Sequence, residues 1–166
     1  MQEQVILVNE RDEQIGLMDK MEAHEKGLLH RAFSVFVFNS KGELLLQQRA
    51  LHKYHSAGLW TNTCCSHQRA GESNQQAAHR RLKEEMGFET ELDLLNSFIY
   101  KAKFDNDLTE HEFDYIFTGR YENNPRINAD EVAAFKWMDL ESLKADILMH
   151  PENYTVWFKI ALARFF

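Results

Sequence analysis

A thiol, an imidazole and two carboxylates lie close together near the middle of the chain. Cys65 and His67 are two residues apart on a segment expected to be extended, so their side chains point to the same face. The helix expected after this segment carries Glu84 and Glu85, and it can bring a carboxylate back toward them. We therefore expect a reactive centre beside a cation site.

A later segment places two carboxylates on either side of a histidine. Glu110 and Glu112 lie on a predicted strand and share one face, whereas His111 faces the other side. Two negative charges that lie so near each other need a cation or a shared proton. Taken alone, the pattern equally describes a solvated edge strand, which binds nothing.

Histidines add nitrogen ligands to these oxygens. His24 and His30 precede the first strand expected to be buried, and His67 shares a face with Cys65. Three imidazoles and two carboxylates would form a mixed site that suits Mn²⁺, Zn²⁺ or Mg²⁺ better than a soft metal. The chain has eight histidines, however, and spacing alone does not choose among them.

The two cysteines are neighbours, so on a strand they face opposite sides and form a poor disulfide pair. We interpret Cys64 as a small buried hydrophobic residue. Cys65 could be a nucleophile, a metal ligand or a proton donor, because an ordinary thiol is mostly protonated at neutral pH. Tyr100 and Trp157 are either core aromatics or walls that face a cation.

Four basic residues come from separate segments, and if they converge they would mark a site for an anion such as diphosphate. They are Lys20, Arg49, Lys53 and Arg81.

The pattern of elements predicts an α+β fold, in which helices flank a mixed sheet. Ser73 and Gln76 form a helix-start signature, and Gly87 is placed to end that helix. The expected strands are Val5–Asn9, Phe33–Phe38, Glu43–Gln48, Leu94–Phe104, Glu110–Tyr121 and Ala133–Met138, with the second and third paired as an antiparallel hairpin. The expected helices are 18–26 as a short helix or ordered loop, 73–86, one capped by Asp139 that runs through Leu148, and one opened by Pro151.

Length and charge limit the class of protein. The 166 residues fit one compact domain, 1–166. The net charge of -7 gives no indication of the basic surface that binds nucleic acid. No apolar run reaches the length of a membrane span, and the N-terminus lacks the features of a signal peptide. We expect a cytoplasmic protein, a monomer or weak homodimer, that acts on a small polar molecule.

Taken together, these residues resemble the type 1 isopentenyl-diphosphate delta-isomerases of the Nudix superfamily, from roughly Val5 to Trp157. The chain carries a version of the Nudix box in which Ser66 stands at the opening glycine and Arg81 at the usual glutamate. The matching box residues are Ser66, Glu72, Arg80, Leu82, Glu84, Glu85 and Gly87.

The resemblance implies the Nudix fold and conversion of isopentenyl diphosphate to dimethylallyl diphosphate through a carbocation-like intermediate. It implies that Cys65 and Glu112 are the acid-base pair, that Tyr100 and Trp157 line the pocket, and that Glu85 helps to hold a Mg²⁺ ion on the substrate diphosphate. It assigns one divalent metal, Mn²⁺, Mg²⁺ or Zn²⁺, to His24, His30, His67, Glu110 and Glu112, and the diphosphate to Lys20, Arg49, Lys53 and Arg81.

Two other functions compete with this one. A Nudix hydrolase of a nucleoside diphosphate derivative would use the box carboxylates and Mg²⁺ to activate water, and it has no need of Cys65 or the three histidines. A non-catalytic binding module would be expected to lack an acid-base group, yet Cys65 and Glu112 are both present.

Overall fold

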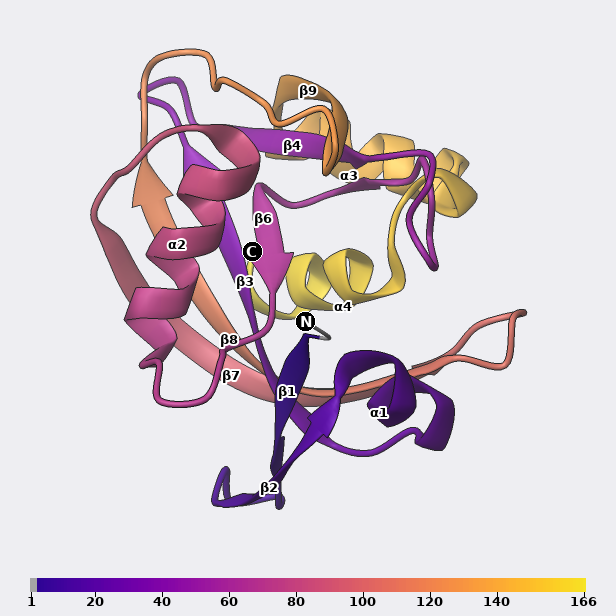
Figure 1. Ribbon diagram of the computed structural model, residues 1–166. Coiled ribbons are helices and arrows are strands. Elements are labelled where there is room, and N and C mark those ends of the chain that lie inside the picture. Colours follow the sequence, from indigo (N-terminus) through magenta and orange to yellow (C-terminus); the bar gives the residue numbers. More distant parts are fainter. Residues whose placement is uncertain (1–2) are drawn as a thin grey trace.

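The computed structural model describes residues 3–166, which form one compact α+β domain around a nine-stranded mixed sheet (Figure 1). The strands are β1 Gln4–Val8, β2 Gln14–Asp19, β3 His30–Phe38, β4 Glu43–Arg49, β5 Trp60–Thr61, β6 Cys64–Ser66, β7 Leu92–Lys103, β8 Thr109–Arg120 and β9 Val132–Asp139. The helices are α1 Lys20–Lys26, α2 Asn74–Met86, α3 Leu140–Met149 and α4 Val156–Phe165, with a 3₁₀ turn at Pro151–Asn153.

Strand β3 lies at the centre of the sheet and joins segments that are far apart in the sequence. It runs parallel to β8, with His30 opposite Glu112, and β8 pairs in turn with β7 as an antiparallel hairpin. On its other side β3 pairs with β6, where Ser34 lies opposite Cys65. The sheet therefore brings the histidine, the carboxylate and the thiol, which come from three strands, to neighbouring positions.

The expected antiparallel hairpin of β3 and β4 is confirmed at its turn, but the pairing is short. The two strands pair antiparallel only at Phe38 and Leu44, next to the turn. Beyond that point β4 pairs with β5 and β9, and β6 occupies the edge of β3 that β4 leaves free. A turn signature predicts that two strands meet, but it does not determine how far they stay together, because partners from elsewhere compete for the same edges.

Alternating side chains of the sheet build two cores, one on each face. Phe33, Val35 and Val37 point toward α2, whereas Phe36 points toward α3 and α4. Each fully buried apolar side chain contributes about 1.5–3 kcal/mol relative to leaving it in water. Helix α2 thus packs on one face of the sheet and helices α3 and α4 pack on the other (Figure 1).

Helix α2 confirms its sequence signature. Ser73 caps the helix in a capping box with Gln76, and Gly87 ends it in the left-handed region at φ 73°. A side chain on Gly87 would meet the Arg126 carbonyl oxygen at 2.4 Å, so only glycine fits there. These two ends fix the helix frame that carries Arg81 and Glu85.

Two boundaries differ from the sequence prediction. The segment 18–26 was expected to be helix or loop, but Gln14–Asp19 is a strand paired with β1, and α1 begins only at Lys20. Pro151 opens a 3₁₀ turn rather than the last helix, because the Thr155 amide donates to the Trp60 carbonyl and the chain stays extended there. Helix α4 therefore starts at Val156.

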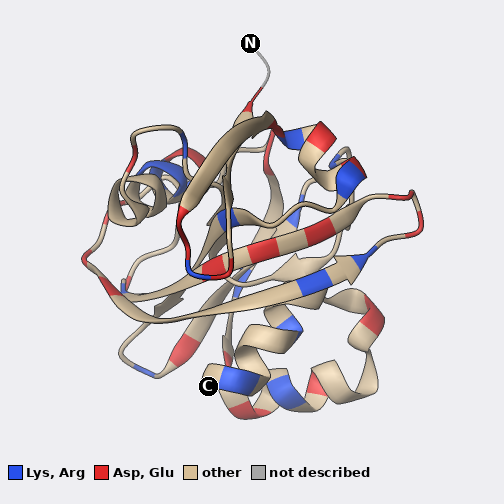
Figure 2. Cartoon of the chain, turned by 90° about the horizontal axis from the view of Figure 1, so that it is seen from below, with Lys and Arg blue, Asp and Glu red and all other residues tan. Residues whose placement is uncertain are grey.

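Acidic and basic residues are interspersed along the strands and helices in the view of Figure 2. Within residues 3–166, no helix is both long and apolar enough to cross a bilayer.

Candidate active site

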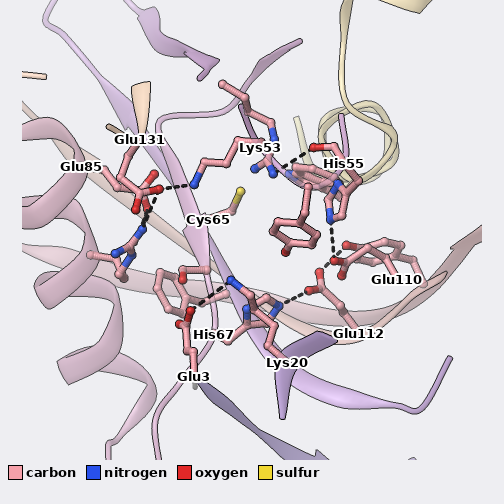
Figure 3. Close-up of a pocket in the computed structure, with 17 residues that line it drawn as sticks. Glu3, Lys20, Lys53, His55, Cys65, His67, Glu85, Glu110, Glu112 and Glu131 are labelled. Carbon is pink, nitrogen blue, oxygen red and sulfur yellow. Dashed lines mark hydrogen bonds and ion pairs between the residues drawn. The ribbon is translucent and has the colours of Figure 1, made fainter. Parts of the chain in front are cut away.

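A pocket opens between α2, the sheet and α4, and its lining contains nearly all the candidate residues (Figure 3). The candidates that line it are Lys20, Arg49, Lys53, Cys65, His67, Arg81, Glu85, Tyr100, Glu110, Glu112 and Trp157. His24 and His30 lie behind this lining and join the pocket through their contacts with the two strand carboxylates.

One end of the pocket is a buried cluster of histidines and carboxylates. His24, His30, His67 and Glu110 are buried, and one ligand atom from each lies within 4.8 Å of the others. Glu112 joins them, because its Oε2 lies 2.8 Å from His67 Nε2 and 3.4 Å from His30 Nε2. The five residues assigned to one metal by the resemblance therefore converge on one place.

Strand β8 supplies both carboxylates because side chains two residues apart share a face. Glu112 lies opposite Tyr100, which packs in the core cluster of α4, so Glu110 and Glu112 point to that side of the sheet. The ring of His111 faces away, and its Nδ1 lies 3.1 Å from the Gly27 carbonyl oxygen. The alternative of a solvated edge strand is wrong, because β8 lies between β3 and β7.

The polar atoms of the cluster fit a divalent cation. His30 Nδ1 donates to the Leu28 carbonyl at 2.9 Å, which leaves the lone pair of Nε2 facing the carboxylates. Among the described residues, His30 Nε2 and Glu110 Oε2 are buried without a hydrogen-bond partner, although they lie only 3.8 Å apart. A metal ion bound by these two atoms would satisfy both.

The electrostatics of the cluster also attract positive charge. Burial alone would lower the pKa of His30, but Glu112 and Glu110 outweigh it and raise that pKa. Burial alone would raise the pKa of Glu110, but hydrogen bonds with His24 and His55 hold it well below its usual value. Glu110 therefore remains an anion inside the protein.

The thiol and the second carboxylate face the same pocket from different strands (Figure 3). Burial raises the pKa of Cys65, although Arg49 opposes it, so the group holds its proton at neutral pH. The Tyr100 hydroxyl donates to Glu112 Oε1 from the position directly opposite on β7. Cys64 points instead into the core beneath α2, and its thiol donates to Glu85 at 3.4 Å.

An aromatic wall closes the pocket beside this pair. Trp157 of α4 is 4% exposed, and the guanidinium of Arg49 lies 5.1 Å from its ring. The Tyr100 ring stacks on Phe98, which places it in the same core cluster as Trp157. These two buried rings form an apolar wall of the pocket beside the thiol and the carboxylate.

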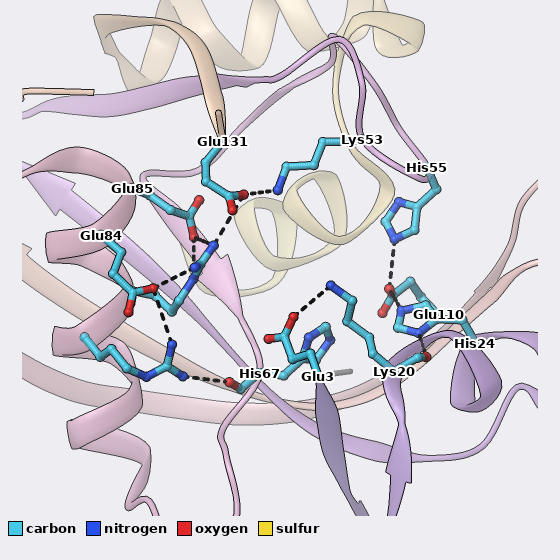
Figure 4. A network of polar contacts seen from close by, with 12 residues as sticks. Glu3, Lys20, His24, Lys53, His55, His67, Glu84, Glu85, Glu110 and Glu131 are labelled. Carbon is cyan, nitrogen blue, oxygen red and sulfur yellow. Dashed lines mark hydrogen bonds and ion pairs between the residues drawn. The ribbon is translucent and has the colours of Figure 1, made fainter. Parts of the chain in front are cut away.

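The pocket lining also contains the four expected cations and three further acidic side chains. Figure 4 shows two of the pairs that they form, Lys20 with Glu3 and Lys53 with Glu131. Lys20 pairs with Glu3 at 3.0 Å. Arg81 contacts Glu85 at 3.0 Å and Glu131 at 3.4 Å, and Lys53 donates to the same Glu131 oxygen. A pocket with this cation set can bind a diphosphate group, which would replace some of these internal pairs.

The sequence did not identify four polar residues that line the pocket, Glu3, Tyr54, His55 and Glu131. Glu131 lies 78 residues from its partner Lys53, and His55 lies 55 residues from its partner Glu110, so no local spacing indicates either contact. The eight histidines of the chain gave no means of separating His55 from the rest.

The sequence and the fold match proteins of one class. Residues 28–158 match the family model of the NUDIX domain. The crystal structure of a protein from Deinococcus radiodurans superposes with a TM-score of 0.83 over 99% of both chains, at 24% sequence identity. That likeness supports the fold alone.

Curated relatives show which group of NUDIX proteins the chain resembles. Isopentenyl-diphosphate Delta-isomerase 2 of Photorhabdus laumondii is 55% identical over 96% of this chain and 90% of its own length. Isopentenyl-diphosphate Delta-isomerase of Serratia proteamaculans is 52% identical over 95% of this chain and 88% of its own. The chain therefore belongs to the NUDIX domain family and, within it, to the isopentenyl-diphosphate Delta-isomerases.

Proposed function

We propose that this protein interconverts isopentenyl diphosphate and dimethylallyl diphosphate in the pocket between α2 and α4. The observation that carries the proposal is the placement of Cys65 and Glu112 around one pocket, which also contains four basic side chains and adjoins the histidine-carboxylate cluster. The names of the relatives supply the substrate, which the geometry alone does not specify.

Moving the double bond requires two proton transfers. One group adds a proton to the terminal CH₂, so the π electrons form the new C–H bond and a tertiary carbocation-like centre develops. A second group removes a proton from the adjacent CH₂, and the electrons of that C–H bond form the new double bond. Cys65 and Glu112 are this pair in our proposal, and their roles exchange when the reaction reverses.

Tyr100 and Trp157 support the pair from the pocket wall. The Tyr100 hydroxyl keeps a proton next to Glu112, since burial raises the pKa of this phenol well above its usual value. Trp157 presents an aromatic face to the carbocation-like centre and excludes water that would quench it.

The cations of the pocket hold the diphosphate in our proposal, and Lys20, Arg49, Lys53 and Arg81 carry that charge. Glu85 would help to bind a Mg²⁺ ion on the diphosphate. One divalent ion, Mn²⁺, Mg²⁺ or Zn²⁺, would be held by the cluster of His24, His30, His67, Glu110 and Glu112. When bound, that ion fixes the carboxylate of Glu112 and adjusts its basicity.

A proton-exchange experiment tests the proposal. The purified protein is incubated with isopentenyl diphosphate and Mg²⁺ in deuterated water, and NMR records dimethylallyl diphosphate and its deuterium content. We expect labelled product with the wild type and none above background with Cys65→Ala. A folded, metal-loaded protein that exchanges nothing but releases phosphate from a panel of nucleotides would instead be a Nudix hydrolase.

A further inference from the structure

His55 lies where the metal-binding end of the pocket meets its aromatic wall. It belongs to the loop between β4 and β5, and its side chain is only 3% exposed. Its Nε2 lies 2.9 Å from Glu110 Oε1, the same oxygen that His24 Nε2 contacts. Because both histidines bind one oxygen, Glu110 Oε2 is left to face His30.

The ring of His55 is packed between two aromatic side chains. It stacks on Phe104 with the ring centroids 4.6 Å apart and the planes 12° from parallel. Its edge-to-face contact with Trp157 has a centroid distance of 5.6 Å and an interplanar angle of 77°. Such geometry restricts the position of the indole as well as that of the imidazole.

The backbone of His55 is tied to the diphosphate end. Arg49 donates from Nη2 to the His55 carbonyl at 3.3 Å, and the same guanidinium lies over Trp157. The loop is held from outside by Asn106, which donates to the Tyr54 carbonyl at 2.8 Å. One residue therefore contacts a candidate metal ligand, Glu110 (Figure 4), a candidate diphosphate cation and the aromatic wall.

We infer that His55 is a positioning residue of the reaction: its imidazole orients the Glu110 carboxylate toward the histidine cluster, and its ring fixes Trp157 over the substrate pocket. His55 acts through these two neighbours and lies outside the group of four side chains whose ligand atoms converge. The role of His55 toward Trp157 rests on the proposed function, whereas its role in metal binding depends only on its contact with Glu110.

Two substitutions separate the two contacts. His55→Phe keeps an aromatic ring but removes the N–H donor to Glu110, whereas His55→Gln keeps an amide donor but removes the ring. We expect His55→Phe to weaken Zn²⁺ or Mn²⁺ binding to the metal-stripped protein by about 10- to 100-fold, the usual effect of losing a hydrogen bond to a metal ligand. Isothermal titration with the metal alone measures this without any substrate.

His55→Gln should show the opposite pattern. Its metal affinity should stay within about threefold of wild type, while kcat falls at least about tenfold with a smaller change in KM, because Trp157 is no longer fixed. The near-ultraviolet circular dichroism of Trp157, obtained by difference from Trp157→Phe, should change in His55→Gln and be retained in His55→Phe. If His55→Phe does not fold, His55→Leu replaces it in the metal titration.

His52 provides the matched control, because it is an exposed histidine three residues earlier in the same loop. His52→Phe and His52→Gln should leave metal affinity, kcat and the Trp157 signal unchanged. An active wild type whose two His55 variants bind metal and turn over normally would overturn the inference. A wild type without isomerase activity would overturn the proposed function instead, and the metal titrations would still decide the role of His55 toward Glu110.

Discussion

Cys64 and Cys65 are adjacent in the sequence but lie in different surroundings. Cys65 lines the pocket, whereas Cys64 is fully buried in the core beneath α2. Successive side chains of a strand point to opposite faces, so these two neighbouring thiols have different chemistry. Replacing each cysteine in turn removes a sulfur atom from one face or the other of the same strand, so the two variants can be compared directly.

Cys65→Ala should lower kcat by at least about 100-fold, the range expected for loss of a positioned acid or base. Metal content should be unchanged, because the thiol is absent from the group of converging ligand atoms. Cys64→Ala should keep most of the turnover and lose about 1 kcal/mol of stability from the missing buried group. Steady-state rates, metal analysis and urea unfolding measure the three effects. Near-normal turnover by Cys65→Ala would exclude the thiol as acid or base.

The residues recognised from sequence are those whose chemistry is visible in a short stretch. Glu110 and Glu112 share a face because they are two apart, and the structure places both in the pocket. The sequence did not indicate His55 or Glu131, because their partners are distant in the sequence. A side chain that only positions another has no motif of its own, so its role depends on the folded contacts.

At the scale of the elements, sequence and structure agree where the determinants are local. The capping box and the terminal glycine define α2, and the turn at 105–107 joins β7 and β8. Strand β2 was not predicted, because Gly16 lies in its interior and the adjacent apolar residues Leu17 and Met18 interrupt the alternation of apolar and polar residues. The parallel pairing of β3 with β8, which creates the metal cluster, is non-local and leaves no sequence pattern.

The loop before α2 is stabilised by an ion pair that depends on pH. Glu72 accepts from Arg80 at 2.6 Å and 3.0 Å, and Arg80 also donates to the His67 carbonyl at 3.3 Å. Burial alone would raise the pKa of Glu72, but the hydrogen bonds from Arg80 and from the Arg69 amide lower it. A lowered folded pKa means stabilisation that is present above the unfolded pKa and is lost as the pH falls through the folded value.

Glu72→Gln should therefore reduce the free energy of unfolding at neutral pH by about 1 kcal/mol, and the difference should shrink at acid pH below the folded pKa. Urea unfolding at several pH values measures both effects. Glu89→Gln is the control, because its contact with Lys83 is 3.8 Å long and both side chains are exposed. A difference that persisted unchanged into acid would contradict the ion-pair explanation.

Helix α4 contributes both packing and a pocket wall through one side chain. Trp157→Phe should lower kcat only several-fold, since a smaller aromatic face remains, whereas Trp157→Ala should lower it far more. The alanine variant should also lose about 3–5 kcal/mol of stability from the cavity it creates. Rates measured well below each melting temperature separate the two effects. Equal rates in the wild type and in both Trp157 variants would contradict the proposal that the carbocation-like centre faces this ring.

The whole molecule is acidic, with a net charge of -7, yet it gathers four cations in one pocket. Three carboxylates, those of Glu3, Glu85 and Glu131, offset most of that charge inside the same pocket. Glu110 and Glu112 line the same pocket, so its five carboxylates outnumber its four cations and the lining has no positive excess for a diphosphate anion. The balance favours a diphosphate that arrives with a divalent cation over one that arrives alone.

Glu131 provides a direct test of this balance, because it contacts two of the cations, Lys53 and Arg81. Glu131→Gln should bind metal-free inorganic pyrophosphate about fivefold more tightly, as expected for about 1 kcal/mol of released pairing. Glu84→Gln is the matched control, because Glu84 contacts Arg81 from outside the pocket at 2.7 Å and should change little. Titration calorimetry in chelator, repeated with Mg²⁺, gives both affinities. Weaker binding by Glu131→Gln with Mg²⁺, and no gain without it, would show that Glu131 holds the cation rather than opposing the anion.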